Sequence, residues 1–211
     1  MAEGTGRVEA FSDGVFAIAI TLLILEIRVP HAGVEGGLWA ALVKLWPSYV
    51  AFVLSFFVIL IMWVNHHELM RLVRAVSYPF LFANGLVLLT VTFVPFPTAI
   101  LAEHLNTPAA GAAVAFYCGT FVVNSLAWGL LFSAIVRHRL FRTEVDDDTI
   151  GRIRRAYIAG PLAYLVSTLV ALRQPALGLA FNASLWLLWI RLSYRTTEEA
   201  IQRRRAAHGG A

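Results

Sequence analysis

A few polar side chains stand inside stretches of sequence that are otherwise apolar. Ser12 and Asp13 precede the run GVFAIAITLLIL, Trp63 and His66 are three residues apart in MWVNHHEL, and Asn84 interrupts YPFLFANGLVLL. Polar groups in such surroundings are costly unless they are paired, and charged ones are usually there for a functional reason. The chemistry that this set predicts is hydrogen bonding between helices. Nothing in the chain has the spacing of a metal site, an activated nucleophile or a cofactor motif, so an enzyme is the weakest interpretation.

A second pattern lies within the first apolar stretch, where certain residues recur at the spacing of a helix face. At about 100° per residue, four side chains lie within about 40° of one line, and two more lie on its edge. The line consists of Gly14, Ile18, Thr21 and Leu25, with Phe11 and Leu22 at the edge. Asp13 points about 120° or more away from this line, so it must face a neighbouring helix. By itself the stripe is compatible with a packing face or with the lining of a pore.

The composition identifies the elements that must position these residues. Of the 211 residues, 59% are hydrophobic and only 14% are charged, against about 25% charged in a soluble domain. Six stretches are long and apolar enough for membrane-spanning helices, which need about 20 residues. They cover residues 8–29, 47–67, 77–102, 109–136, 155–172 and 175–193. We therefore predict an all-α integral membrane protein in which residues 1–211 form one six-helix unit with a short basic tail, 196–211.

The basic residues orient the predicted helices. With a cytoplasmic N-terminus, fourteen of the seventeen Lys and Arg residues fall inside, and only Arg28, Lys44 and Arg173 fall outside. By the positive-inside rule both termini are then cytoplasmic. The excess charge lies where it would attract anionic lipids, so the basic composition needs no nucleic-acid partner.

The intervening segments predict little further structure. Residues 36–46 are too short to span and are typical of an interfacial helix under the outer headgroups. The sequence RTEVDDDTIGRIRR, at 142–155, is interpreted as a solvated cytoplasmic loop, with a divalent-ion or regulatory site as the less favoured alternative. The tail is interpreted as a frayed helical end.

The polar side chains of the first three spans lie at similar depth, in the inner leaflet. We therefore predict a buried polar network that anchors the first helix to the second and third. Its members would be Arg7, Ser12, Asp13, Trp63, His66 and Asn84. An interfacial histidine that only reaches toward the headgroups remains an alternative for His66.

These residues also carry a family resemblance. Arg7, followed after three residues by FSD at 11–13 and then by GVFAIAIT, combines with Trp63-x-x-His66 and with NGLVLLTVTFVPFPT. This combination resembles the transmembrane protein 175 family, the lysosomal potassium channels and their prokaryotic relatives. The resemblance covers the first three spans strongly, whereas the last three match only in number and hydropathy.

The resemblance implies a homotetramer in which four copies of the first helix line a central pore. It places the hydrophobic constriction on Ile18, with Leu25 and Leu22 as further apolar positions, and potassium preference on Thr21, where K⁺ would pass without a resident metal or cofactor. It assigns the polar anchor to Arg7, Phe11, Ser12, Asp13, Trp63 and His66, to which Asn84 is added by depth. Animal members often carry a serine where this chain has Ala17, so one hydroxyl beside the constriction is missing.

The function expected from these observations is a potassium-preferring channel for monovalent cations, in the plasma membrane of a prokaryote and partnered by its own copies and by anionic lipids. The main alternative is a secondary ion transporter. Transporters use broken helices near the midplane, for which Pro95, Pro97 and Gly160-Pro161 are candidates. A non-conducting structural membrane protein is the third possibility.

Overall fold

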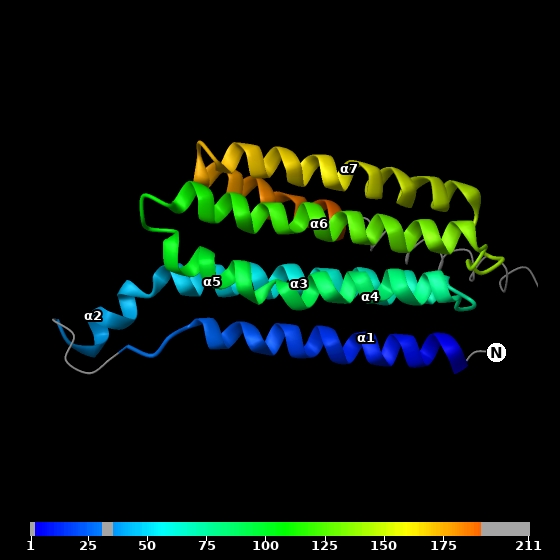
Figure 1. Cartoon of the computed structure of the whole chain (residues 1–211), viewed down its shortest axis with the longest axis horizontal. Coiled ribbons are helices and arrows are strands. Elements are labelled where there is room, and N and C mark those ends of the chain that lie inside the picture. Colours follow the sequence, from blue (N-terminus) through cyan, green and yellow to red (C-terminus); the bar gives the residue numbers. More distant parts are fainter. Residues whose placement is uncertain (1–2, 31–35, 191–211) are drawn as a thin grey trace, which may run out of the picture.

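The computed structural model describes residues 3–30 and 36–190, and its long helices run nearly parallel or antiparallel to one another (Figure 1). The chain begins with α1 and continues through a short 3₁₀ turn, η1, into helices α2 to α7 and one last helix. Their bounds are α1 Glu3–Leu22, η1 Leu23–Glu26, α2 Gly37–Lys44, α3 Trp46–Leu72, α4 Tyr78–Phe93, α5 Pro95–His104, α6 Ala110–Arg137, α7 Asp147–Ala171 and a last helix Pro175–Ile190. The predicted all-helical architecture is confirmed.

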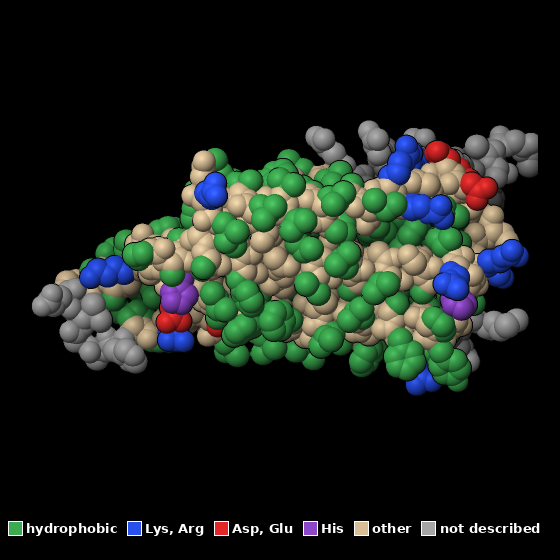
Figure 2. Space-filling view, turned by 45° about the horizontal axis from the view of Figure 1, so that its top comes forward, with side chains coloured by type: hydrophobic (Ala, Val, Ile, Leu, Met, Phe, Trp, Pro, Cys, Tyr) green, Lys and Arg blue, Asp and Glu red, His purple; other side chains and the backbone are tan. Residues whose placement is uncertain are grey.

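Among the described residues, four helical segments are long and apolar enough to cross a membrane. They are Thr5–Glu26, Trp46–Leu72, Tyr78–His104 and Ala110–Arg137. Figure 2 shows hydrophobic side chains over the middle of the molecule and charged ones gathered at its two ends, as expected of a surface that faces lipid. The last two predicted spans correspond to α7 and to the shorter apolar helix Pro175–Ile190.

The third predicted span, 77–102, is interrupted at one residue. Ser77 caps α4 by accepting a hydrogen bond from the backbone N–H of Phe80 at 3.4 Å, and α4 ends at Phe93 because Pro95 offers no backbone donor. Val94, between α4 and α5, keeps right-handed helical angles (φ −54°, ψ −38°). The two helices therefore continue in one direction and count as one span.

The prediction of a loop over residues 142–155 is wrong in its second half. Helix α7 begins at Asp147, where Asp146 serves as N-cap and accepts a hydrogen bond from the backbone N–H of Thr149 at 2.9 Å. Asp147 and Asp148 lie in the first turn, where their charge complements the positive end of the helix dipole. The acidic run is thus a helix start and not a solvated loop.

The predicted interfacial helix corresponds to α2, which follows Gly36 in a left-handed conformation (φ 87°). It lies at the end of the molecule opposite the N-terminus (Figure 1). The predicted tail, 196–211, and the end of the sixth span lie outside the described residues.

The helices pack in two groups that α3, α4 and α5 connect. Helix α1 contacts α3 and α4 along one side, and α6 contacts α4, α5 and α7 on the other. The largest buried side chains, such as Phe16, Phe80, Tyr117 and Phe121, come from α1, α4 and α6. Helix α1 therefore lies at the edge of the subunit, held from one side only.

Candidate permeation helix and its polar contacts

Helix α1 has one buried face and one open face. Phe16, Ala19 and Leu23 are buried against α3, α4 and α5, at the three- and four-residue spacing of one helix face. On the other face, 59% of Ile18 and 70% of Leu25 are exposed in the single subunit. The predicted stripe thus lies on the open face, where neither α3 nor α4 covers it.

The structure changes the predicted stripe in two ways: the open face is broader, and its last turn is not α-helical. Gly14, Ile18, Thr21 and Leu25 are all exposed, and so are Phe11 and Leu22 at the edge. Ala17 and Ile24 are exposed as well, which makes the open face wider than the predicted line. The last turn is a 3₁₀ helix from Leu23 to Glu26, in which residues three apart eclipse each other. The rule of 100° per residue therefore does not extend to Leu25.

Thr21 is the polar side chain on this open face. Its hydroxyl donates a hydrogen bond to the backbone carbonyl of Ile18 at 2.9 Å. With its proton used in this bond, the hydroxyl oxygen keeps lone pairs that can face outward. An oxygen of this kind can accept a bond from water or contact a cation.

Two side-chain contacts join α1 to α3. The indole Nε1–H of Trp63 donates to Oδ1 of Asp13 at 2.8 Å. One turn nearer the N-terminus, Nδ1 of His67 lies 2.9 Å from Oε1 of Glu9. Glu9 and Asp13 are four apart on α1, and Trp63 and His67 are four apart on antiparallel α3, so the two contacts lie one above the other.

A directional chain of hydrogen bonds joins α1, α3 and α4. Nε2 of His66 donates to Oδ1 of Asn84 at 2.8 Å, because an amide oxygen only accepts. Nδ2 of Asn84 then donates to Oγ of Ser12 at 3.1 Å, and the Ser12 hydroxyl donates to the backbone carbonyl of Val8 at 2.8 Å. All three side chains are buried. Each one donates to the next, so a change at Asn84 removes both side-chain links.

The ring of His66 is enclosed by aromatic neighbours. The ring of Phe16 is 5.4 Å away and that of Trp128 is 6.0 Å away, between centroids. Its Nδ1 atom is buried and has no hydrogen-bond partner among the described residues. The alternative of an interfacial histidine does not fit this position, because the side chain is fully buried.

Of the predicted anchor residues, the structure brings together Ser12, Asp13, Trp63, His66 and Asn84, and it leaves two outside. Arg7 is exposed, and no hydrogen bond or ion pair of its side chain is found within the described ranges. Phe11 is 68% exposed and lies on the open face. The guanidinium is thus not part of the buried network, because Arg7 lies at the first turns of α1, where water and headgroups can solvate it.

Sequence reasoning missed the Glu9–His67 pair, although its signal was present. Both residues stand one helical turn from a predicted anchor residue, which places them on the same helix faces. A second missed group has no such signal: Oγ of Ser55 lies 2.6 Å from Oγ1 of Thr98 and 3.1 Å from the Tyr117 hydroxyl. It joins α3, α5 and α6, and only the packing of these helices shows it.

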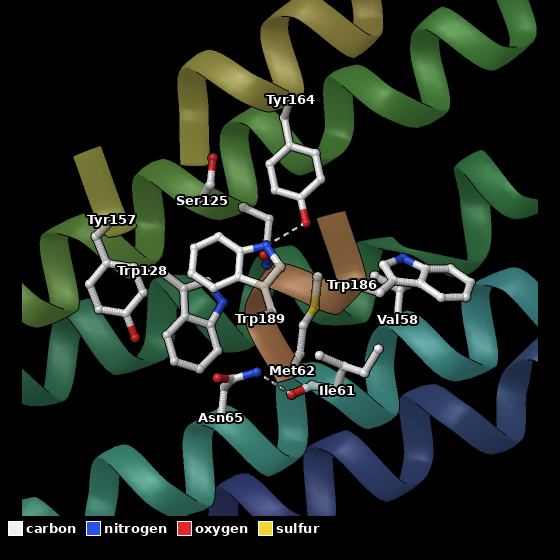
Figure 3. A pocket seen from close by; sticks show the side chains of 11 residues that line it. Val58, Ile61, Met62, Asn65, Ser125, Trp128, Tyr157, Tyr164, Trp186 and Trp189 are labelled. Atoms are coloured by element: carbon white, nitrogen blue, oxygen red, sulfur yellow. Dashed lines mark hydrogen bonds between the residues drawn. The ribbon is translucent and has the colours of Figure 1, made fainter. Parts of the chain in front are cut away.

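A separate cavity lies between α3, α6, α7 and the last helix (Figure 3). Trp128, Tyr157, Tyr164 and Trp189 surround it, and Nε1 of Trp189 donates to the Tyr164 hydroxyl at 2.9 Å. Asn65 also lines it, but its amide bonds the carbonyl of Ile61 in its own helix at 2.8 Å. Within residues 3–30 and 36–190 there is no cluster of three His, Cys, Asp or Glu side chains that could hold a metal ion.

Comparison with known proteins relates this geometry to a family. The family described as endosomal/lysosomal potassium channel TMEM175 matches residues 7–95, which include most of α1 and all of α2, α3 and α4. A potassium channel of Chamaesiphon minutus is 51% identical over 77% of this chain and 82% of its own length. One of Streptomyces collinus is 46% identical over 88% of this chain and 91% of its own length.

The resemblance extends to solved structures and to animal proteins. The crystal structure of a lysosomal potassium-selective channel TMEM175 homolog from Chamaesiphon minutus superposes with a TM-score of 0.79 at 43% identity, covering 90% of this chain and 97% of that one. The endosomal/lysosomal proton channel TMEM175 of Bos taurus is 41% identical over 42% of this chain but only 20% of its own length. The match to two bacterial proteins over most of both lengths leads to one conclusion: the chain is an integral membrane protein that belongs to the TMEM175 family.

Proposed function

We propose that this protein is a potassium-preferring cation channel, and that its pore is formed by α1 from four identical subunits. The observation that carries the proposal is the two-sided character of α1. One face is tied to α3 and α4 by buried hydrogen bonds, while the other leaves Ile18, Thr21 and Leu25 uncovered in the subunit. The family is one of channels and not of enzymes, and its bacterial relatives are named potassium channels.

In the proposed assembly, each subunit crosses the membrane six times with both termini in the cytoplasm. Residues 1–211 form one channel domain, placed in a prokaryotic plasma membrane. The four apolar spans together with α7 and Pro175–Ile190 support this count. Four copies of α1 around a symmetry axis would cover the open face of each.

Ile18 is proposed as the closed constriction, with Leu22 and Leu25 as further apolar layers nearer the outside. Four β-branched side chains meeting on the axis have little rotamer freedom to move apart. A narrow apolar ring dewets, and an ion cannot cross it without its hydration shell. Opening then requires α1 to move or rotate.

Thr21 is proposed as the selectivity layer. Four outward-facing hydroxyl oxygens, one turn from Ile18, could replace part of the hydration shell of a cation. Potassium releases its water more readily than sodium, so the layer favours potassium. The back-bonded hydroxyl of Thr21 supports this role, because its oxygen remains an acceptor.

The test is potassium flux through the purified protein in liposomes, with reversal potentials for selectivity. Thr21→Val keeps the shape and removes the hydroxyl, so we expect the potassium-to-sodium permeability ratio to fall toward one. The matched control is Thr92→Val, because Thr92 is also exposed and donates to its own helix, at 2.9 Å to the carbonyl of Leu89. An unchanged ratio in Thr21→Val would place selectivity elsewhere.

The gate is tested by Ile18→Asn, which we expect to admit water and raise the basal flux. Ile18→Phe should lower it. The control is Ile24→Asn, because Ile24 is 52% exposed, close to the 59% of Ile18, but lies outside the predicted stripe. If intact Ile18→Asn channels conducted no more than wild type while Ile24→Asn did, the proposed pore face would be wrong.

The transporter alternative depends on broken helices, and the structure offers little support for it. Val94, between α4 and α5, keeps helical angles, and α7 continues through Pro161. No long stretch of backbone is thereby freed to bind a substrate. Flux that follows the electrochemical gradient without saturation would favour the channel.

A further inference from the structure

A groove for which nothing above gives a use lies between α6 and α7. Its volume is about 690 Å³, and apolar side chains such as Leu126, Leu130 and Ile158 line its length. Each of these three is more than half exposed. Gly129 forms part of the floor, and a Cβ atom added there would meet nothing within 4 Å. The groove is therefore open and apolar, with room for a chain along its floor.

One end of this groove is positively charged. Arg137, the last residue of α6, and Arg154, in the second turn of α7, both line it and are both exposed. No ion pair of either guanidinium is found among the described residues. Two carboxylates at the start of α7 have partners of their own, since Asp148 pairs with Arg152 at 3.9 Å and Asp146 caps α7. Two guanidinium groups, one from each helix and neither paired within residues 3–30 and 36–190, thus lie at the end of an apolar groove.

We propose that this groove binds an anionic phospholipid. The phosphate would lie between Arg137 and Arg154, because guanidinium groups bind phosphate oxygens with charge-assisted hydrogen bonds. One acyl chain would lie along Leu126, Leu130 and Ile158, over Gly129. By the charge distribution this end faces the cytoplasm, where anionic headgroups gather.

The positive charge of the groove also disfavours two other possible occupants, the tail of this chain and a second copy of it. Residues 191–211 contain five Arg and two Glu, so the tail carries a net +3 and would be repelled by the two arginines. A second copy would bring its own basic end to the same membrane surface. An anionic lipid neutralises the site, and it has the apolar length that the groove requires. This inference goes beyond the proposed channel function and does not depend on ion conduction.

The experiment measures the midpoint of thermal unfolding of the detergent-purified, full-length protein with added phosphatidylglycerol. We expect a rise of about 2 to 4 °C or more, since a ligand that binds only the folded state stabilises it. Phosphatidylcholine with the same acyl chains, and inorganic phosphate at the same concentration, should give little or no shift. In Arg137→Gln/Arg154→Gln the phosphatidylglycerol shift should be lost.

The matched control is Arg142→Gln/Arg155→Gln, which removes the same charge at the same end of the molecule. Arg142 and Arg155 are exposed but do not line the groove, so this variant should keep the shift. Gly129→Leu keeps both arginines and fills the floor, so it should reduce the shift. Unfolding midpoints without lipid verify that each variant is folded.

Three outcomes would overturn the proposal. An equal phosphatidylglycerol shift in both double variants would show a general charge effect, and an equal shift with phosphatidylcholine would show no headgroup preference. The third is that Gly129→Leu or Arg137→Gln/Arg154→Gln changes the oligomer mass and leaves the lipid shift intact, which would assign the groove to another copy of this chain. None of these outcomes bears on potassium flux, so failure here is distinguishable from failure of the proposed channel.

Discussion

The two sides of the subunit are held together by different means. On the α1 side, buried polar side chains from α1, α3 and α4 form specific hydrogen bonds, with Asn84 at the centre. On the α7 side, the last helix approaches α7 closely at Gly178 and packs aromatic rings between the helices, with hydrogen bonds from Ser167 to the Gly178 carbonyl and from Trp189 to Tyr164. Hydrogen bonds fix a direction and a register, whereas glycine contacts and ring packing fill space. The side that carries the proposed pore helix is thus the one on which a chain of buried side-chain hydrogen bonds joins three helices.

The largest loss of stability is expected from Asn84→Leu, which removes the central residue of the hydrogen bonds between α1, α3 and α4. It leaves the buried Nε2–H of His66 without its acceptor, at about 1 to 3 kcal/mol, and also removes the hydrogen bond that Ser12 Oγ accepts, although the Ser12 hydroxyl keeps its bond to the Val8 carbonyl. Thermal unfolding in detergent measures the loss. The control is Asn65→Leu, since the hydrogen bond that Asn65 makes, to the Ile61 carbonyl, stays within its own helix. Equal destabilisation by both changes would show that the network has no special role.

The next largest loss of stability is expected from Gly178→Ala, which disturbs the close packing of the last helix against α7. A Cβ atom there would lie 2.5 Å from Cβ and 2.6 Å from Cα of Ala171, so the last helix must move away from α7. We expect a destabilisation of about 1 to 3 kcal/mol, typical of overpacking. Gly129→Ala, in open space, should be neutral or slightly stabilising. If Gly178→Ala unfolded at the wild-type temperature, the close approach would not matter for stability.

A smaller effect is expected from Asp13→Ala, because Asp13 is only half-buried. The Trp63 indole loses its acceptor, at about 1 kcal/mol, and we expect a weakened oligomer with little change in ion selectivity. Oligomer mass in detergent and flux in liposomes are measured together. Asp13→Ala/Trp63→Phe removes the orphaned donor and should recover part of the loss. A stable oligomer with altered selectivity would instead place Asp13 on the permeation path.

The smallest effect is expected from Trp189→Phe. The change keeps an aromatic ring against Tyr157 and removes the hydrogen bond to the Tyr164 hydroxyl, which is worth about 0.5 to 1.5 kcal/mol. Trp189→Ala should cost more, because it removes the ring as well. Unfolding midpoints rank the two variants, and equal losses would mean that the hydrogen bond dominates on this side too.

Sequence patterns predicted much of this arrangement because they depend on local properties. The apolar stretches placed α1, α3, α6 and the joined α4 and α5, and the similar depth of Ser12, Trp63, His66 and Asn84 predicted that they would meet. The start of α7 was missed because an acidic run is typical of both a solvated loop and a helix N-terminus. Arg7 was assigned to the network because depth was considered without the direction in which its side chain leaves the helix.

The sequence by itself determined that the protein lies in a membrane, where its helices are and that α1 has two different faces, since hydropathy and a period of 3.6 residues suffice for these. Only the tertiary structure decided which donor meets which acceptor. The bond from Trp63 to Asp13 joins residues fifty positions apart, and the contact of Ser55 with Tyr117 joins residues 62 apart. The groove between α6 and α7, with an arginine from each helix at its end, likewise exists only when the two helices are packed. Such contacts depend on the rotation and separation of whole helices, which no local pattern encodes.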